Sequence, residues 1–501
     1  IQTLEKLRQT NTVIHNIIVE PLPLNRVEQL VADTFNESIT ETRVKLLTEL
    51  VFNKTQGNPF FLTQLFKTLY SENLLVYQVA TDKWRWDIQE IQAVGITDYN
   101  IVELIARNIC KLPPNTQKVL QLAACIGNQF SLDILSTVNQ TSEILTADYL
   151  WSALQAGLIL PLSSNYKIPT VFEETSDIFK VSDVKVEYKF LHDQVQQAAY
   201  SLILESERKN THLKIGQLLL KNTTSEQQRD NIFTLVNQLN FGTELLTTQI
   251  AKDELAQLNL IAGQKAKAAT AYESALNYLN IGLPLLHPDS WQNQYKLTLS
   301  YYIEISEAEY LNANLTRALF LCELALKQVN NLLYNVKFQQ IKMKIYLAQN
   351  QFDTVLDIGQ NVLQMLGISL VESPPQNIGV EQLTSQPIMN DSYKLAAMEV
   401  LILIFAPACF RESAIAGSIL YTMIQLSRQY GNSPPSVSAY ALYGTFTAWI
   451  DIDLAYQLGQ ISLQILDKLN AKEFKSKALV TIYISIIYKK EHIKRTINPL
   501  H

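Results

Sequence analysis

The spacing of apolar residues along most of the chain is the feature that most restricts its fold. Apolar positions recur three and four residues apart over long stretches, and this spacing places them on one face of an α-helix. Glycine and proline, which interrupt helices, number only 15 and 16 in 501 residues. A chain of this length also exceeds what one hydrophobic core usually serves. We therefore expect a mainly α protein built from two to four structural units.

The N-terminal region contains the clearest exception to the helical spacing. Residues 13–19, VIHNIIV, form a short β-rich run that is closed by Pro21 and Pro23. An amphipathic stretch, LNRVEQLVADTF, follows at residues 24–35. We interpret residues 1–96 as the last strand of a truncated α/β domain that passes into a helical lid.

Residues 97–204 show a different order of elements. Amphipathic helices are expected first, and two short β-rich segments, LILPL and VEYKF, follow them. Helices followed by a two-stranded ribbon are typical of a winged-helix domain, a fold that often binds DNA. However, no Lys or Arg occurs between Lys118 and Lys167, and phosphate contacts need cations. We therefore expect no nucleic-acid binding here.

The C-terminal half repeats one pattern, in which a small residue lies among apolar positions at helical spacing. Ala275, Ala318 and Val355 occupy equivalent positions, and the interval between them drifts beyond the 34 residues of a strict tetratricopeptide repeat (TPR). We predict a TPR-like α-solenoid over residues 251–501, preceded by a helical linker at 205–250. Residues 368–391, rich in Pro, Ser and Gln, are expected to form a long loop.

The chain lacks the sequence signatures of several enzyme classes. It contains no Gly-Lys dipeptide, and hence no phosphate-binding loop, and no HExxH or GxSxG motif. The four cysteines are scattered through apolar stretches and are interpreted as buried thiols in a reducing cytoplasm. The most apolar windows, at 401–410 and 478–488, are shorter than a membrane span and predict buried helices. We expect no catalytic activity, metal site or membrane span in this chain.

Two local features could form a site. Gly57, Asn58 and Pro59 separate two helical stretches, and local chemistry explains all three. Glycine ends a helix in the left-handed conformation, asparagine caps the next one, and proline suits its first position. His192 and Asp193 begin another amphipathic helix, where a capping or packing role for the histidine is favoured over phosphate transfer.

The order of several blocks resembles one known family. PLPLNRVEQLVADTF, KTQGNPFFLTQLFKTLYSENLL, WRWD and YKFLHDQVQQAAYSLI carry the resemblance, which extends from about residue 12 to Leu500. The family comprises cyanobacterial multidomain signalling proteins with a serine/threonine kinase, an AAA-like STAND ATPase with helical repeats, and GAF and sensor histidine kinase domains. The chain corresponds only to the lid, winged helix and TPR-like repeats, which suggests a fragment.

The resemblance implies a second role for the two local features. In the intact parent, a Gly-x-Pro motif of the lid lies against the nucleotide. Gly57, Asn58 and Pro59 match this motif by position. His192 is a candidate to lie near the phosphates. The parent would bind ATP or ADP with Mg, whereas this chain alone is expected to bind no cofactor.

Two functions therefore remain open from the sequence. The first is a regulatory segment of a nucleotide-switched signal-transduction kinase, whose repeats contact protein partners or the adjoining kinase and GAF domains. The second is a free-standing TPR-like adaptor without a nucleotide site. A transcription regulator is disfavoured because the winged helix lacks cations.

Overall fold

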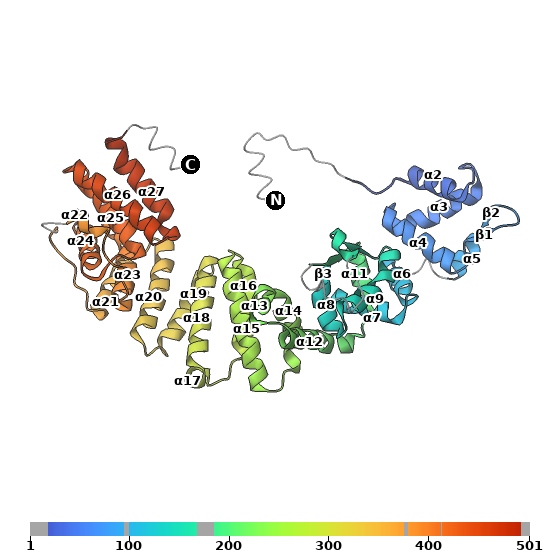
Figure 1. The fold of residues 1–501 in the computed structure, drawn as a ribbon, viewed down its shortest axis with the longest axis horizontal. Helices are drawn as coiled ribbons and strands as arrows, with labels where there is room; N and C mark the ends of the chain where they lie inside the picture. The colour runs from blue at the N-terminus through green and yellow to red at the C-terminus, as the bar shows by residue number, and fades with distance from the viewer. Residues whose placement is uncertain (1–18, 95–99, 168–184, 375–378, 412, 492–501) are drawn as a thin grey trace, which may run out of the picture. The chain divides into compact units, whose positions relative to one another are not determined.

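The computed structural model describes residues 19–94, 100–167, 185–374, 379–411 and 413–491. They divide into two compact units, residues 1–246 and 247–501, which are coloured blue to green and green to red in Figure 1. The expected mainly α fold class is confirmed. The predicted strand at 13–19 falls almost entirely outside the described residues.

The first unit begins with three helices and a β-hairpin. α2 (Leu24–Phe35) coincides with the predicted helix, and Phe35 at its end packs against the rings of Phe66, Trp84 and Trp86. The two tryptophans lie on or directly after the second strand of the hairpin, so this cluster fixes the hairpin on the helices. The remaining elements of this region are α3 (Thr42–Thr55), α4 (Pro59–Ser71), β1 (Val76–Gln78), β2 (Lys83–Arg85) and α5 (Ile88–Ala93).

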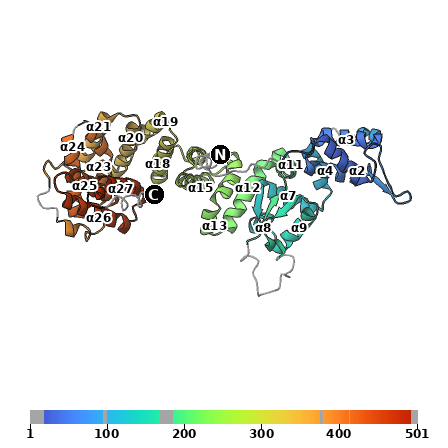
Figure 2. The same cartoon turned by 90° about the horizontal axis from the view of Figure 1, so that it is seen from above.

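The next region of the first unit combines helices with a small antiparallel sheet. Figure 2 shows α7, α8 and α9 gathered beside one another. The two predicted β segments form β4 (Ile159–Pro161) and β5 (Glu187–Phe190). A third strand, β3 (Gln129–Ser131), was not predicted from the sequence. The strand order in the sheet is β3-β5-β4. The winged-helix assignment stays a prediction. The helices are α6 (Ile101–Cys110), α7 (Pro114–Ile126), α8 (Leu132–Asn139), α9 (Glu143–Gln155) and α11 (Asp193–Ser201).

The first unit continues with α12 (Glu205–Asn222), α13 (Ser225–Asp230) and α14 (Ile232–Phe241). His212 on α12 is only 3% exposed and joins three neighbouring helices. Its Nδ1 lies 2.7 Å from Gln238 Oε1 and its Nε2 lies 3.1 Å from the Tyr200 hydroxyl. The Gln238 side-chain nitrogen donates to the Cys125 carbonyl oxygen at 2.7 Å. The side-chain oxygen of Gln238 therefore accepts a hydrogen bond from the Nδ1–H group of His212. A neutral imidazole satisfies the whole network.

The second unit is a run of paired helices, seen in Figure 1 from α15 to α27. Each pair packs on the next, and the repeat residues Ala275, Ala318 and Val355 are completely buried at these contacts. Within the expected loop at 368–391 the structure adds one short helix, α22 (Val380–Leu383). The longer helices are α15 (Gln249–Ala268), α16 (Tyr272–Gly282), α18 (Tyr295–Leu311), α19 (Leu315–Leu326), α20 (Leu332–Ala348), α21 (Phe352–Met365), α23 (Ser392–Arg411), α24 (Ser413–Tyr430), α25 (Pro434–Thr447), α26 (Ile452–Lys468) and α27 (Lys472–Ser485).

Two expectations about apolar stretches need correction. α23 has 20 residues, so it is long and apolar enough to cross a bilayer, unlike the ten-residue window considered in the sequence. It packs against α20, α21, α24 and α25, however, as a core helix of the second unit does. Of the four cysteines, Cys125 and Cys322 are buried as expected, whereas Cys110 and Cys409 are exposed because they lie at helix ends.

Two further expectations stay predictions. These are the cytoplasmic location and the domain boundaries at 96/97, 204/205 and 250/251. The hydrogen bonds of Gln238 to Cys125 and of His212 to Tyr200 nevertheless show that residues of the expected linker pack directly on α7 and α11.

The buried His212 predicts a pH dependence of stability in the first unit. Burial holds the pKa of His212 below its usual value, so the unfolded chain binds a proton more readily than the folded one. This contribution to stability is complete above the unfolded pKa of about 6.5 and is lost as the pH falls below it. The protection factors of amides in α12 and α14, which correct for the change of the intrinsic exchange rate with pH, should therefore fall more from pH 7.5 to pH 5 in the wild type than in His212→Gln. An equal fall in both proteins would contradict this role.

Candidate functional site

The turn at Gly57 is fixed by a close backbone crossing. Gly57 is buried and has φ of 74°, a conformation that glycine adopts at little cost. The Leu22 amide donates a hydrogen bond of 2.9 Å to the Gly57 carbonyl oxygen. A Cβ atom at position 57 would lie 1.9 Å from the Leu22 carbonyl oxygen. The segment that leads into α2 therefore passes directly against this turn, and only glycine fits.

Asn58 and Pro59 start α4 as the sequence predicted. Asn58 is the N-cap residue, and its side-chain oxygen accepts from the amides of Phe60 at 3.0 Å and Phe61 at 3.3 Å. Pro59 occupies the first helical position, where its missing N–H leaves no hydrogen bond unmade, and its ring is exposed. The turn thus presents a rigid apolar ring at the start of a helix.

His192 lies beside this turn, although 132 positions separate it from Phe60 in the sequence. Its ring stacks on Phe60 with 5.6 Å between centroids and an interplanar angle of 4°, and it meets Phe61 edge to face at 5.2 Å. His192 is also the N-cap of α11, because its Nδ1 accepts from the Gln194 amide at 3.2 Å. It is therefore a capping and a packing histidine at once.

The contact brings the starts of two helices, α4 and α11, to one place. Helix N-termini carry partial positive charge and favour anions. At α4, two of the free amides are already bonded to Asn58, and at α11 the acidic Asp193 lies in the first turn. The described residues are suited to pack against a ligand from one side, but they do not form a cradle for phosphates.

Polar contacts hold α4 to α6 and to the turn after α9. The Lys67 ammonium donates to the Ala156 carbonyl oxygen at 3.1 Å, and the Asn108 amide donates to the Thr68 hydroxyl at 3.0 Å. Lys111 pairs with Glu72 at 2.7 Å and lowers the pKa of that carboxyl group through their hydrogen bond. α4 is thus attached along its whole length to the region that carries His192.

Sequence reasoning placed Gly57, Asn58, Pro59 and His192 individually, and the structure brings all four into one cluster. The sequence reasoning did not assign Phe60 and Phe61, whose rings contact His192. Two aromatic residues directly after the helix-starting proline were the available signal, but nothing in the sequence identified their partner. Among the described residues, no group of three or more His, Cys, Asp or Glu is arranged to hold a metal ion.

Comparison with known proteins found sequence similarity to a signal-transduction protein. No family model matches the chain. It is 27% identical over an alignment of 557 residues to the hybrid signal transduction histidine kinase G of Dictyostelium discoideum, covering 95% of this chain and 16% of that protein. A solved STAND protein with a tetratricopeptide repeat sensor, from Pyrococcus horikoshii, is 12% identical with a TM-score of 0.32, over 97% of this chain and 67% of that one.

The similarity to the histidine kinase extends over nearly the whole chain, which spans only a small part of that relative. The chain is therefore related to one segment of a hybrid signal transduction histidine kinase. The cyanobacterial origin and the serine/threonine kinase domain that the resemblance implies stay predictions.

The crossing at Gly57 predicts an unusually costly substitution. Gly57→Ala should lower the free energy of unfolding by about 2–4 kcal/mol, because the left-handed backbone and the contact with Leu22 both penalise a Cβ atom. Gly157→Ala is the matched control, since Gly157 has φ of 70° but open space around its Cα. It should cost only about 1 kcal/mol. Urea denaturation of both variants measures the difference, and equal losses would show that the crossing does not constrain position 57.

Proposed function

We propose that the chain is the regulatory and scaffold segment of a nucleotide-switched signal-transduction protein kinase. The single observation that carries the proposal is the contact of His192 with Phe60 and Phe61 beside the Gly57 turn. The relationship to a segment of a hybrid histidine kinase supports the signalling role.

The nucleotide would be ATP or ADP with Mg, bound by a longer protein that supplies the phosphate loop absent from these 501 residues. Gly57, Asn58 and Pro59 would form one wall of that site, with the exposed proline ring against the nucleotide. His192 would approach the phosphates from the start of α11. The chain alone should neither hydrolyse ATP nor phosphorylate a substrate, because the cradle for the phosphates is missing.

The switch would act on the joint between α4 and α11. A ligand shifts an equilibrium only by its differential affinity for two states. A nucleotide that touches both Pro59 and His192 would stabilise the stacking of the His192 ring on Phe60, which joins α4 to the start of α11, whereas an empty site would leave this contact without that added stabilisation. The helical repeats would then contact a protein partner or adjoining kinase and GAF domains.

Substitutions on the two helices test the shared nucleotide site in the longest open reading frame that contains the chain. Pro59→Ala removes the exposed ring, and His192→Asn keeps an N-cap residue but removes the imidazole. Each should raise the Kd for a fluorescent ATP analogue about fivefold or more, which is about 1 kcal/mol. Fluorescence titration gives the affinities, and thermal denaturation measures the stability of each variant.

Pro114→Ala is the matched control, because Pro114 also occupies the first position of a helix, α7. It should change stability by about 0.4–1 kcal/mol, as expected for a proline that restricts the unfolded chain, and leave the affinity unchanged. If Pro59→Ala and His192→Asn behave like Pro114→Ala, the turn is only a joint between helices. A longer protein without any phosphate loop would favour the adaptor function instead.

A further inference from the structure

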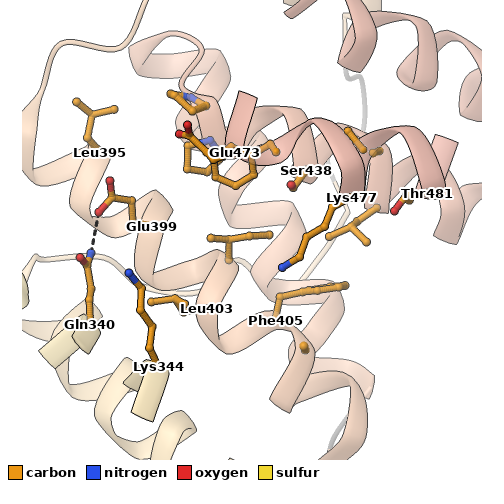
Figure 3. A pocket seen from close by; sticks show the side chains of 18 of the residues that line it. Gln340, Lys344, Leu395, Glu399, Leu403, Phe405, Ser438, Glu473, Lys477 and Thr481 are labelled. Carbon is orange, nitrogen blue, oxygen red and sulfur yellow. Dashed lines mark hydrogen bonds between the residues drawn. The ribbon is translucent and has the colours of Figure 1, made fainter. Parts of the chain in front are cut away.

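A cavity of about 610 Å³ lies within the second unit, between α20, α23, α25 and α27. Figure 3 shows side chains from these helices converging on it. Its volume is within the range of about 300–1,000 Å³ that is typical of sites for small ligands. The helices all belong to one compact unit, so the cavity is independent of the nucleotide cluster in the first unit.

Much of the cavity wall is apolar. Leu403 and Phe405 from α23 and Phe474 from α27 line it, and Figure 3 shows Leu403 beside Lys344. Val480 on α27 is 49% exposed, although its apolar run predicted a buried helix. Apolar side chains that face a cavity instead of a packed neighbour leave a surface for the apolar body of a ligand.

Lys344 on α20 is a charged side chain of this wall. It makes no hydrogen bond or ion pair within the described part of the chain, and burial lowers the pKa of its ammonium group, although the negative charges of Glu307 and Glu399 act in the opposite direction. Its neighbours differ, because Lys337 pairs with Glu307 at 3.1 Å and Lys267 pairs with the same carboxylate at 2.7 Å. A poorly solvated ammonium group gains strongly from a bound anion.

The other charges define where an anion fits. Gln340 donates a hydrogen bond of 2.9 Å to Glu399 and holds that carboxylate on one side of the cavity. In Figure 3 the carboxylates of Glu399 and Glu473 lie above the ammonium groups of Lys344 and Lys477, with the latter two entering from α20 and α27. The lower part of the cavity therefore combines two cations with the apolar Leu403 and Phe405.

We propose that this cavity binds a small amphipathic organic anion, with its carboxylate between Lys344 and Lys477 and its apolar body against Leu403 and Phe405. A single alkyl carboxylate has this chemistry. A cation bound in the same orientation would place its charge beside two lysines, and a neutral alcohol would leave the Lys344 ammonium group without a bound anion. The site should therefore discriminate by charge.

Direct binding tests the proposal with the full chain. The probe is 11-(dansylamino)undecanoate, whose fluorescence increases in an apolar site, and the competitors are decanoate, decanol and decyltrimethylammonium. We expect saturable binding of one probe per chain. Decanoate should displace the probe at concentrations at least about tenfold lower than decanol or decyltrimethylammonium. Neither of these two competitors can form the charge-assisted hydrogen bond between a carboxylate and the Lys344 ammonium group.

Three variants locate the site. Lys344→Met keeps the apolar stem and should weaken probe binding about tenfold or more. Ala406→Trp adds a large side chain at an exposed position of the cavity wall and should prevent binding without a change in charge. Lys475→Met removes an exposed lysine from α27 that does not line the cavity, and it should leave the affinity unchanged.

Melting temperatures of the three variants should lie close to that of the wild type, so a loss of affinity reports on the site rather than on folding. The proposal is wrong if the wild type shows no saturable binding, if the three competitors are equally effective, or if Lys344→Met and Ala406→Trp bind the probe as tightly as Lys475→Met does. None of these results depends on nucleotide binding.

Discussion

The backbone crossing at Gly57 is the constraint on which the candidate site depends. The left-handed glycine lets the Leu22 segment pass within hydrogen-bond distance, and it directs the chain into α4 through Asn58 and Pro59. The direction of α4 then places Phe60 and Phe61 against His192. A side chain at position 57 would force the segment before α2 away from the turn. Helix entry, capping and aromatic contact therefore form one connected arrangement.

The two units use different interactions for stability. In the first unit, polar and aromatic contacts between residues far apart in sequence hold short helices together, as Lys67, Asn108 and the neutral His212 illustrate. In the second unit, neighbouring helical pairs bury small residues such as Ala275 and Ala318 at close contacts. Repeats of this kind contact mainly their neighbours, and the ion pair between Lys267 on α15 and Glu307 on α18 joins the first helices of two neighbouring pairs.

Local features were predictable from the sequence because their causes are local. The helix at 24–35, the cap at Asn58 and the repeat residue Ala275 follow from spacing and residue type. The stacking of His192 on Phe60 and the partial burial of the Lys344 ammonium group are consequences of tertiary packing, which the sequence pattern does not encode. The exposure of Cys110 and Cys409 likewise depends on how each helix end meets its neighbours.

The proposed function requires that the Gly57 turn and the start of α11 respond to nucleotide as one site. Hydrogen exchange of the product of the longest open reading frame that contains the chain, measured without nucleotide, with ADP and with ATP and Mg, tests it most directly. The account predicts that protection of residues 54–62 and residues 190–196 changes together and differs between the two nucleotides. Nucleotide binding that changes protection elsewhere but leaves both segments unaltered would contradict the account.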